Sequence, residues 1–299
     1  MKSKKVKKFM TKINKQTGYV KSFDDLDIYY ESRGNGEVIF FVYGIACLIN
    51  HWHFQFKYFA PHFKTVCFDL RGHHKTKTPK VRENISLEAL AKDIAAIAHN
   101  LGAKKIHLVG HSFGAQVILK TYELFPELVK SIIFVNGFSK NPVKGMFGLD
   151  FVEKLYHFIN ENYQSNPVLW KTMWKLGIDN PLAVPITALA GGFNIKLTNL
   201  KDIQVYVKGV SNLDLGNFLI LFNELMTYDG DAVLNKIKVP TLIISGEEDR
   251  ITPVDFQKKM HKHIKGSEFL LVPYGSHCTQ LDFPEFVNLR IEKFYKDHF

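Results

Sequence analysis

The chain has 299 residues, a formal net charge of +10, 46% hydrophobic residues and 23% charged residues. This composition excludes wholesale disorder, and the length predicts a core of roughly 200 residues with an insertion or a small second domain. Residues 1–21 contain eight lysines and no acidic residue, so the rest of the chain carries 31 Lys and Arg against 29 Asp and Glu. That nearly neutral body argues against a nucleic-acid-binding face.

Residues 1–17 are predicted to form a basic tail. The tail lacks the apolar stretch of a secretory signal, and no later segment is apolar enough to predict a membrane-spanning helix. Its lysines favour either a disordered solubilising tail or weak contact with an anionic membrane. The cysteines Cys47, Cys67 and Cys278 form no CxxC pair. We therefore expect free thiols, a cytoplasmic location and no cysteine-based zinc site.

In chain order, the alternating segment 18–33 predicts an antiparallel hairpin at a sheet edge. Short apolar runs then alternate with amphipathic helical patterns, which is typical of a mostly parallel sheet covered by helices on both faces. The expected strands are 38–44, 65–69, 105–110, 130–137, 240–246 and 268–273, and the expected helices are 86–102, 115–125, 253–264 and 284–298.

The stretch 139–237 interrupts this alternation. It has helical patterns near 146–162, 165–176, 200–209 and 213–226 and no convincing strand, so it is interpreted as a helical cap inserted between two strands. The α/β core accordingly comes in two parts, 18–138 and 238–299.

The strongest chemical signal is Gly110-His111-Ser112-Phe113-Gly114, which lies between a predicted strand and a predicted helix. The small residues at 110 and 114 allow a sharp turn that presents the Ser112 hydroxyl, with the helix N-terminus favouring negative charge nearby. In this context Ser112 is predicted to be a nucleophile rather than an ordinary turn residue.

A serine nucleophile needs a base and a group that orients the base. Asp249 and His277 follow two consecutive predicted strands at their carboxyl ends, where open α/β sheets place functional groups. The order Ser112, Asp249, His277 is that of an α/β-hydrolase triad. Glu247 and Glu248 are neighbouring alternatives for the acid.

The sequence resembles the α/β-hydrolase superfamily, in its branch of small capped esterases and lactonases, from about residue 18 to 299. The resemblance is carried by FFVYGIA with Trp52, FDLRGHHKTKTP, VGHSFGA, and ISGEEDRITP followed by YGSH. It implies an oxyanion hole formed by the backbone N–H groups of Ile45 and Phe113. Tyr43-Gly44 stands where the family commonly has His-Gly, and we expect both residues to border the substrate.

Two histidines, two cysteines and two tryptophans are expected to have mainly structural roles. His73 and His74 replace family residues in the DLRGHHKT turn, which is expected to shape the loop beside the oxyanion strand. Cys47 and Cys278 are expected to be buried packing residues. Trp170 and Trp174 form an i, i+4 aromatic pair in the cap, which favours helix packing or, alternatively, the lining of an apolar substrate pocket.

The resemblance implies a serine hydrolase that cleaves an ester or lactone of a small apolar substrate, without a metal or organic cofactor. Serine at position 112 argues against relatives that use aspartate there, such as dehalogenases and epoxide hydrolases. Thioester, amide and carbon–carbon bond hydrolysis and cofactor-free perhydrolysis stay open. So does a ligand-binding receptor in which hydrolysis is slow or incidental.

Overall fold

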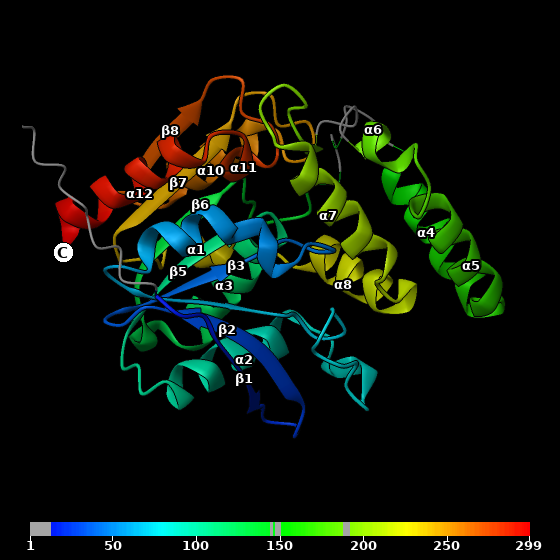
Figure 1. The fold of residues 1–299 in the computed structure, drawn as a ribbon, viewed down its shortest axis with the longest axis horizontal. Coiled ribbons are helices and arrows are strands. Elements are labelled where there is room, and N and C mark those ends of the chain that lie inside the picture. The colour runs from blue at the N-terminus through cyan, green and yellow to red at the C-terminus, as the bar shows by residue number, and fades with distance from the viewer. Residues whose placement is uncertain (1–12, 144–145, 147–150, 188–191) are drawn as a thin grey trace, which may run out of the picture.

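The structure is a computed structural model that describes residues 13–143, 146, 151–187 and 192–299. Its centre is an eight-stranded sheet in the order β1-β2-β4-β3-β5-β6-β7-β8 (Figure 1). Strands β1 (Gln16–Lys21) and β2 (Asp27–Arg33) form the expected antiparallel edge hairpin. Because β1 begins at Gln16, the sheet starts two residues inside the segment predicted to be tail.

The remaining strands run parallel to one another. Nearly every residue of β3, β4, β5, β6 and β7 is buried. Because both faces of these strands are covered, their sequences are continuously apolar. Their bounds are Val38–Val42 for β3, Lys64–Phe68 for β4, Ile106–His111 for β5, Val129–Val135 for β6, Thr241–Gly246 for β7 and Glu268–Val272 for β8.

Helices cover both faces of the sheet, as predicted. Helix α1 (His53–Phe59) packs against α12 (Pro284–His298) on one face, and α2 (Leu87–Asn100) packs against α3 (Phe113–Leu124) on the other (Figure 1). The Ser86 side chain accepts a hydrogen bond from the Ala89 N–H, which caps α2 as expected. Shorter core helices are α10 (Val254–His263) and α11 (Thr279–Asp282). Helix α9 (Asp231–Leu234) lies within the segment predicted as cap and contacts the core helix α10.

The cap lies between β6 and β7 in sequence, and its described residues contain helices and no strand. These helices are α4 (Val152–Ser165), α5 (Pro167–Ile178), α6 (Ala183–Thr187), α7 (Leu200–Ser211) and α8 (Leu215–Thr227). Helices α7 and α8 lie beside the core, and α4 and α5 form an outer layer (Figure 1). The first predicted cap helix, near 146–162, includes residues 147–150, which lie outside the described residues; helix α4 begins at Val152.

Candidate active site

Ser112 lies in the sharp turn between β5 and α3. Its backbone has φ 54° and ψ −125°, a region that L-residues seldom adopt. The flanking glycines are required by close packing: a Cβ on Gly110 would lie 2.6 Å from the Gly114 carbonyl oxygen, and one on Gly114 would lie 2.3 Å from that of Val42. The GHSFG sequence therefore folds into a strained turn that holds the hydroxyl at the carboxyl end of the sheet.

Gly44 packs directly against this turn. A Cβ at Gly44 would lie 2.8 Å from Ser112 Cβ and 3.2 Å from Ser112 Oγ, so only glycine lets the loop after β3 approach the serine this closely. Within the described residues, the N–H groups of Ile45 and Phe113 donate no hydrogen bond to protein acceptors. Phe113 is also the first residue of α3, whose N-terminus favours negative charge.

Asp249 and His277 are joined across two loops that follow neighbouring strands. Nδ1 of His277 lies 2.9 Å from Oδ2 of Asp249, and both residues are buried. Glu247 and Glu248, the alternative acids, are exposed. The carboxylate that contacts the histidine is thus that of Asp249.

The Asp249 carboxylate accepts a full set of hydrogen bonds. Oδ1 accepts from the N–H groups of Ile251 at 2.9 Å and Thr252 at 2.8 Å. Oδ2 accepts from the Thr252 hydroxyl at 2.7 Å and the Asn136 side-chain amide at 2.8 Å. These donors fix the orientation of the carboxylate. Sequence reasoning missed Asn136 and Thr252; the available signal was an Asn-Gly pair directly after a buried strand.

Ser112 and His277 line the same cavity, which has a volume of about 360 Å³. Among the described residues, neither Ser112 Oγ nor His277 Nε2 has a hydrogen-bond partner, so both reactive atoms are available to a ligand. Catalytic hydrogen bonds often shorten only when substrate is bound. The cavity wall is mainly apolar and includes Ile45, Phe138, Met146, Phe218, Phe222, Leu225 and Ile251.

Both histidines of the DLRGHHKT turn hold the loop that contains Ile45. His73 Nε2 accepts a hydrogen bond from the Ala46 N–H at 3.3 Å, and His74 Nε2 donates to the Cys47 carbonyl at 2.9 Å. Burial lowers the pKa of His73 to about 3, which keeps Nε2 an acceptor at neutral pH. These two contacts are consistent with the expected role of the turn in shaping that loop.

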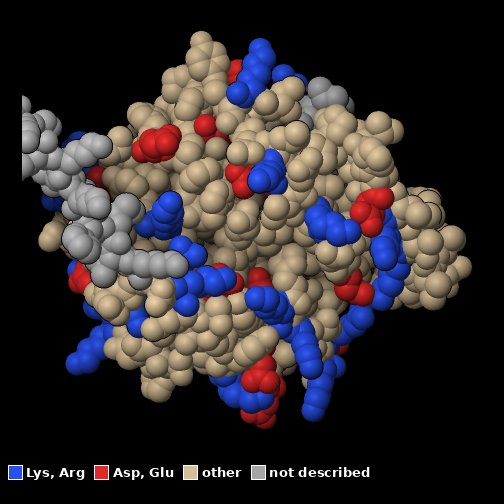
Figure 2. All heavy atoms as spheres, in the orientation of Figure 1, with Lys and Arg blue, Asp and Glu red and all other residues tan. Residues whose placement is uncertain are grey.

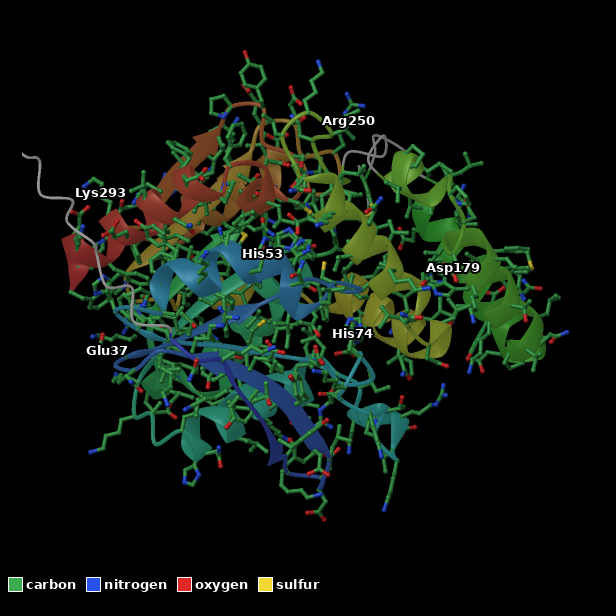
Figure 3. All side chains as sticks on the ribbon, viewed as in Figure 1. Glu37, His53, His74, Asp179, Arg250 and Lys293 are labelled. Atoms are coloured by element: carbon green, nitrogen blue, oxygen red, sulfur yellow. The ribbon has the colours of Figure 1, made fainter. Side chains whose placement is uncertain are left out.

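Figure 3 labels His74 between the core and the cap, with Asp179 on the far side among the cap helices.

The structure places Tyr43 away from the substrate border predicted for it. Its side chain is fully buried, does not line the cavity, donates to Asp69 Oδ1 at 3.2 Å and accepts from the Leu70 N–H at 3.0 Å. Tyr43 therefore connects the end of β3 to the loop after β4. These hydrogen bonds give tyrosine a structural role at the position where the family commonly has histidine.

Trp170 and Trp174 also lie away from the cavity that Ser112 and His277 line. They line a second apolar cavity of about 450 Å³ between α4, α5 and α8, and the Trp174 ring lies 5.0 Å from that of Phe218. Neither tryptophan lines the cavity that contains Ser112, so no observed contact supports the substrate-binding role predicted for them. The contacts of the two tryptophans fit the packing of cap helices better than the lining of the Ser112 cavity.

Two further histidines lie beside His277. The His111 ring is centred 4.8 Å from the His277 ring, and the His51 ring is centred 5.0 Å from that of His111. Burial lowers the pKa of His51 to about 3 and that of His111 well below its usual value. Both imidazoles are therefore neutral at pH 7, and they do not place a competing positive charge beside His277.

Comparison with known proteins agrees with the fold. The family described as "alpha/beta hydrolase fold" matches residues 37–174. The human protein ABHD8 is 25% identical over 263 residues, covering 86% of this chain and 54% of that protein, and mouse epoxide hydrolase 4 is 25% identical over 254 residues, covering 82% and 69%. The chain thus spans about half the length of ABHD8.

A solved esterase from Exiguobacterium antarcticum superposes with a TM-score of 0.75 at 20% identity, covering 94% of this chain and 100% of that one. At this identity the superposition shows a shared fold. Together with the strand order and the family match over residues 37–174, it shows that this chain has the α/β-hydrolase fold.

Proposed function

We propose that the protein is a serine hydrolase that cleaves the carboxylic ester or lactone bond of a small apolar substrate. One observation carries the proposal: Ser112 and His277 line the same apolar cavity, and His277 is hydrogen-bonded to Asp249. Such a cavity favours acyl groups without charge. Serine at the turn, rather than a carboxylate, favours attack on a carbonyl carbon over epoxide opening.

The reaction would begin when His277 Nε2 removes the Ser112 proton as the hydroxyl attacks the carbonyl carbon. Asp249 keeps the proton of His277 on Nδ1 and stabilises the imidazolium. The N–H groups of Ile45 and Phe113 would stabilise the oxyanion, each contributing on the order of 2.7–4 kcal/mol. His277 then protonates the leaving group, and water hydrolyses the acyl-enzyme by the same route.

The test is hydrolysis of p-nitrophenyl esters graded by acyl length, alongside lactones and thioesters. We expect turnover by the parent and loss of activity by at least about 10³-fold in Ser112→Ala, with an unchanged unfolding temperature. Equal rates in parent and variant would refute the proposal.

The acid is tested separately with a matched pair, Asp249→Asn and Glu248→Gln. Because the His277 imidazole contacts the carboxylate of Asp249, whereas Glu248 is exposed, we expect a large loss of kcat only in Asp249→Asn. The reverse pattern would assign the acid to Glu248.

A ligand-binding receptor is the second candidate, because Ser112 has no hydrogen bond to His277 among the described residues. Tight binding of an ester, with less than about one turnover per minute across the panel, would favour it over an enzyme. We also propose a cytoplasmic location, which is supported by the three buried, free cysteines.

A further inference from the structure

A cluster of two thiols and two imidazoles borders the catalytic cavity. Cys47, His51, His111 and Cys278 are each buried, with exposed fractions of 5%, 3%, 1% and 3%. They come from the loop after β3, the turn before α1, the end of β5 and the residue after His277. Nothing in the proposed hydrolytic reaction uses them, and their distance in sequence hides the cluster from motif analysis.

The spacing of these groups approaches that of a tetrahedral metal site. One ligand atom each from Cys47, His51 and His111 lie within 4.8 Å of one another. His51 Nε2 lies 3.4 Å from the Cys278 sulfur and 4.0 Å from the Cys47 sulfur. Zinc bonds of about 2.0–2.3 Å to N and S imply ligand separations of about 3.3–3.8 Å. Shifts of about 1 Å would bring the ligand atoms of Cys47, His51 and His111 to such separations, and the Cys278 sulfur already lies at one from His51 Nε2.

His111 is prepared as a ligand. Its Nε2 lies 2.8 Å from the His277 carbonyl oxygen, which can only accept, so Nε2 carries the proton. The lone pair is then on Nδ1, which is buried and has no hydrogen-bond partner. Metal-binding histidines commonly donate their second ring N–H to a carbonyl in this way, which fixes the tautomer.

The donor set selects the class of ion. Thiolate and imidazole suit Zn²⁺ and related soft ions, whereas Mg²⁺ and Ca²⁺ require oxygen ligands. Two thiolates and two neutral imidazoles would balance the charge of a divalent ion. The rings of Phe193 and Tyr206 pack against His51, which suits a neutral complex.

We propose that Cys47, His51, His111 and Cys278 form an inhibitory site for a thiophilic divalent cation such as Zn²⁺. Binding releases the two thiol protons to solvent and involves no oxidation. The Cys47 N–H donates to the Gly44 carbonyl at 3.1 Å, and Cys278 is joined to His277. Contraction around the ion therefore moves the loop of Ile45 and the loop of His277 together. Inhibition by the metal ion rests on the proposed hydrolytic function, whereas binding of the metal ion does not.

Binding is measured with metal-free protein under a thiol-sparing reductant, by titrating Zn²⁺ against a fluorescent zinc indicator. We expect one equivalent to bind and the unfolding temperature to rise, with no response to Mg²⁺. Cys47→Ala with Cys278→Ala is expected to weaken binding by more than about 100-fold. Cys67→Ala, which removes the third buried cysteine, is the matched control and keeps parental affinity.

Ser112→Ala separates the two proposals, because it should still bind Zn²⁺ whether or not hydrolysis is observed. In the parent, Zn²⁺ is expected to lower ester turnover and a chelator to restore it, while the double variant keeps its own metal-free rate. Equal affinity of parent and double variant overturns the site. If the double variant does not fold, Co²⁺ replaces Zn²⁺ in the parent: the absence of a thiolate-to-cobalt absorption band overturns it.

Discussion

Asn136 connects the two loops that carry Asp249 and His277. Its side-chain N–H₂ donates to Asp249 Oδ2 at 2.8 Å and to the Ser276 carbonyl at 2.7 Å, and its Oδ1 accepts from the Gly246 N–H at 3.2 Å. Its backbone φ of 48° is in the left-handed region, which asparagine tolerates better than most residues. A single amide thus holds residues from β6, β7 and the loop after β8 in one arrangement.

Asn136→Gly removes the amide and keeps the backbone conformation. A hydrogen bond to a charged group is worth about 1.5–3 kcal/mol, so we expect kcat to fall roughly 10- to 100-fold if the loss is felt in the transition state. KM should change little, because Asn136 does not line the cavity. Steady-state kinetics on a p-nitrophenyl ester measure both.

Asn136→Ala provides the control for backbone strain. Alanine removes the same hydrogen bonds and adds the cost of a positive φ, so it should unfold at a lower temperature than the glycine variant while showing a similar kcat. If Asn136→Gly keeps parental kcat, the amide supports the fold alone and does not position the acid.

Helix α8 separates two apolar spaces. Phe218 and Phe222 line both the cavity of about 360 Å³ that contains Ser112 and His277 and the cavity of about 450 Å³ between α4, α5 and α8. The rings are centred 5.6 Å apart, and together they form a partition of the kind that sets how far an acyl chain can extend.

Phe218→Ala is expected to open this partition and shift the preference towards longer acyl chains. Each additional buried CH₂ contributes about 0.8 kcal/mol, or about fourfold in kcat/KM. The ratio of long-chain to short-chain ester hydrolysis reports the shift. Phe158→Ala, which truncates an exposed ring lining neither cavity, is the control. An unchanged ratio in Phe218→Ala would show that the second cavity does not receive substrate.

The core elements could be predicted because each carries a strong local pattern. Buried parallel strands are continuously apolar, and their carboxyl ends meet at one edge, which is why Ser112, Asp249 and His277 could be grouped from the sequence alone. Helix α1 was not predicted, because its seven residues provide too few turns for a clear period. The Cys47–Cys278 neighbourhood was also missed, since contacts between distant loops leave no local signal.

The whole molecule distributes its charge and apolar surface unevenly. The outer cap helices expose large apolar side chains. The right-hand rim, where α4 and α5 lie, shows few charged side chains in this view (Figures 1 and 2). Exposed fractions there reach 76% at Val168, 69% at Leu176 and 56% at Phe158. No helix in the described ranges has the length and apolarity needed to cross a bilayer. Exposed apolar side chains gathered on one face are typical of an interaction surface.

We propose that the basic N-terminal segment makes weak contact with anionic lipid. Six of its lysines fall within residues 1–12, each worth about 1 kcal/mol near an anionic surface at low salt. The parent should therefore co-sediment with phosphatidylserine vesicles, less so as salt rises and not with neutral vesicles. Replacing those six lysines by serine at constant length isolates charge from chain length, while Leu176→Asp tests the apolar face of the cap. If the serine-substituted chain pellets as well as the parent, charge in this segment does not drive binding; loss confined to Leu176→Asp would assign the contact to the cap.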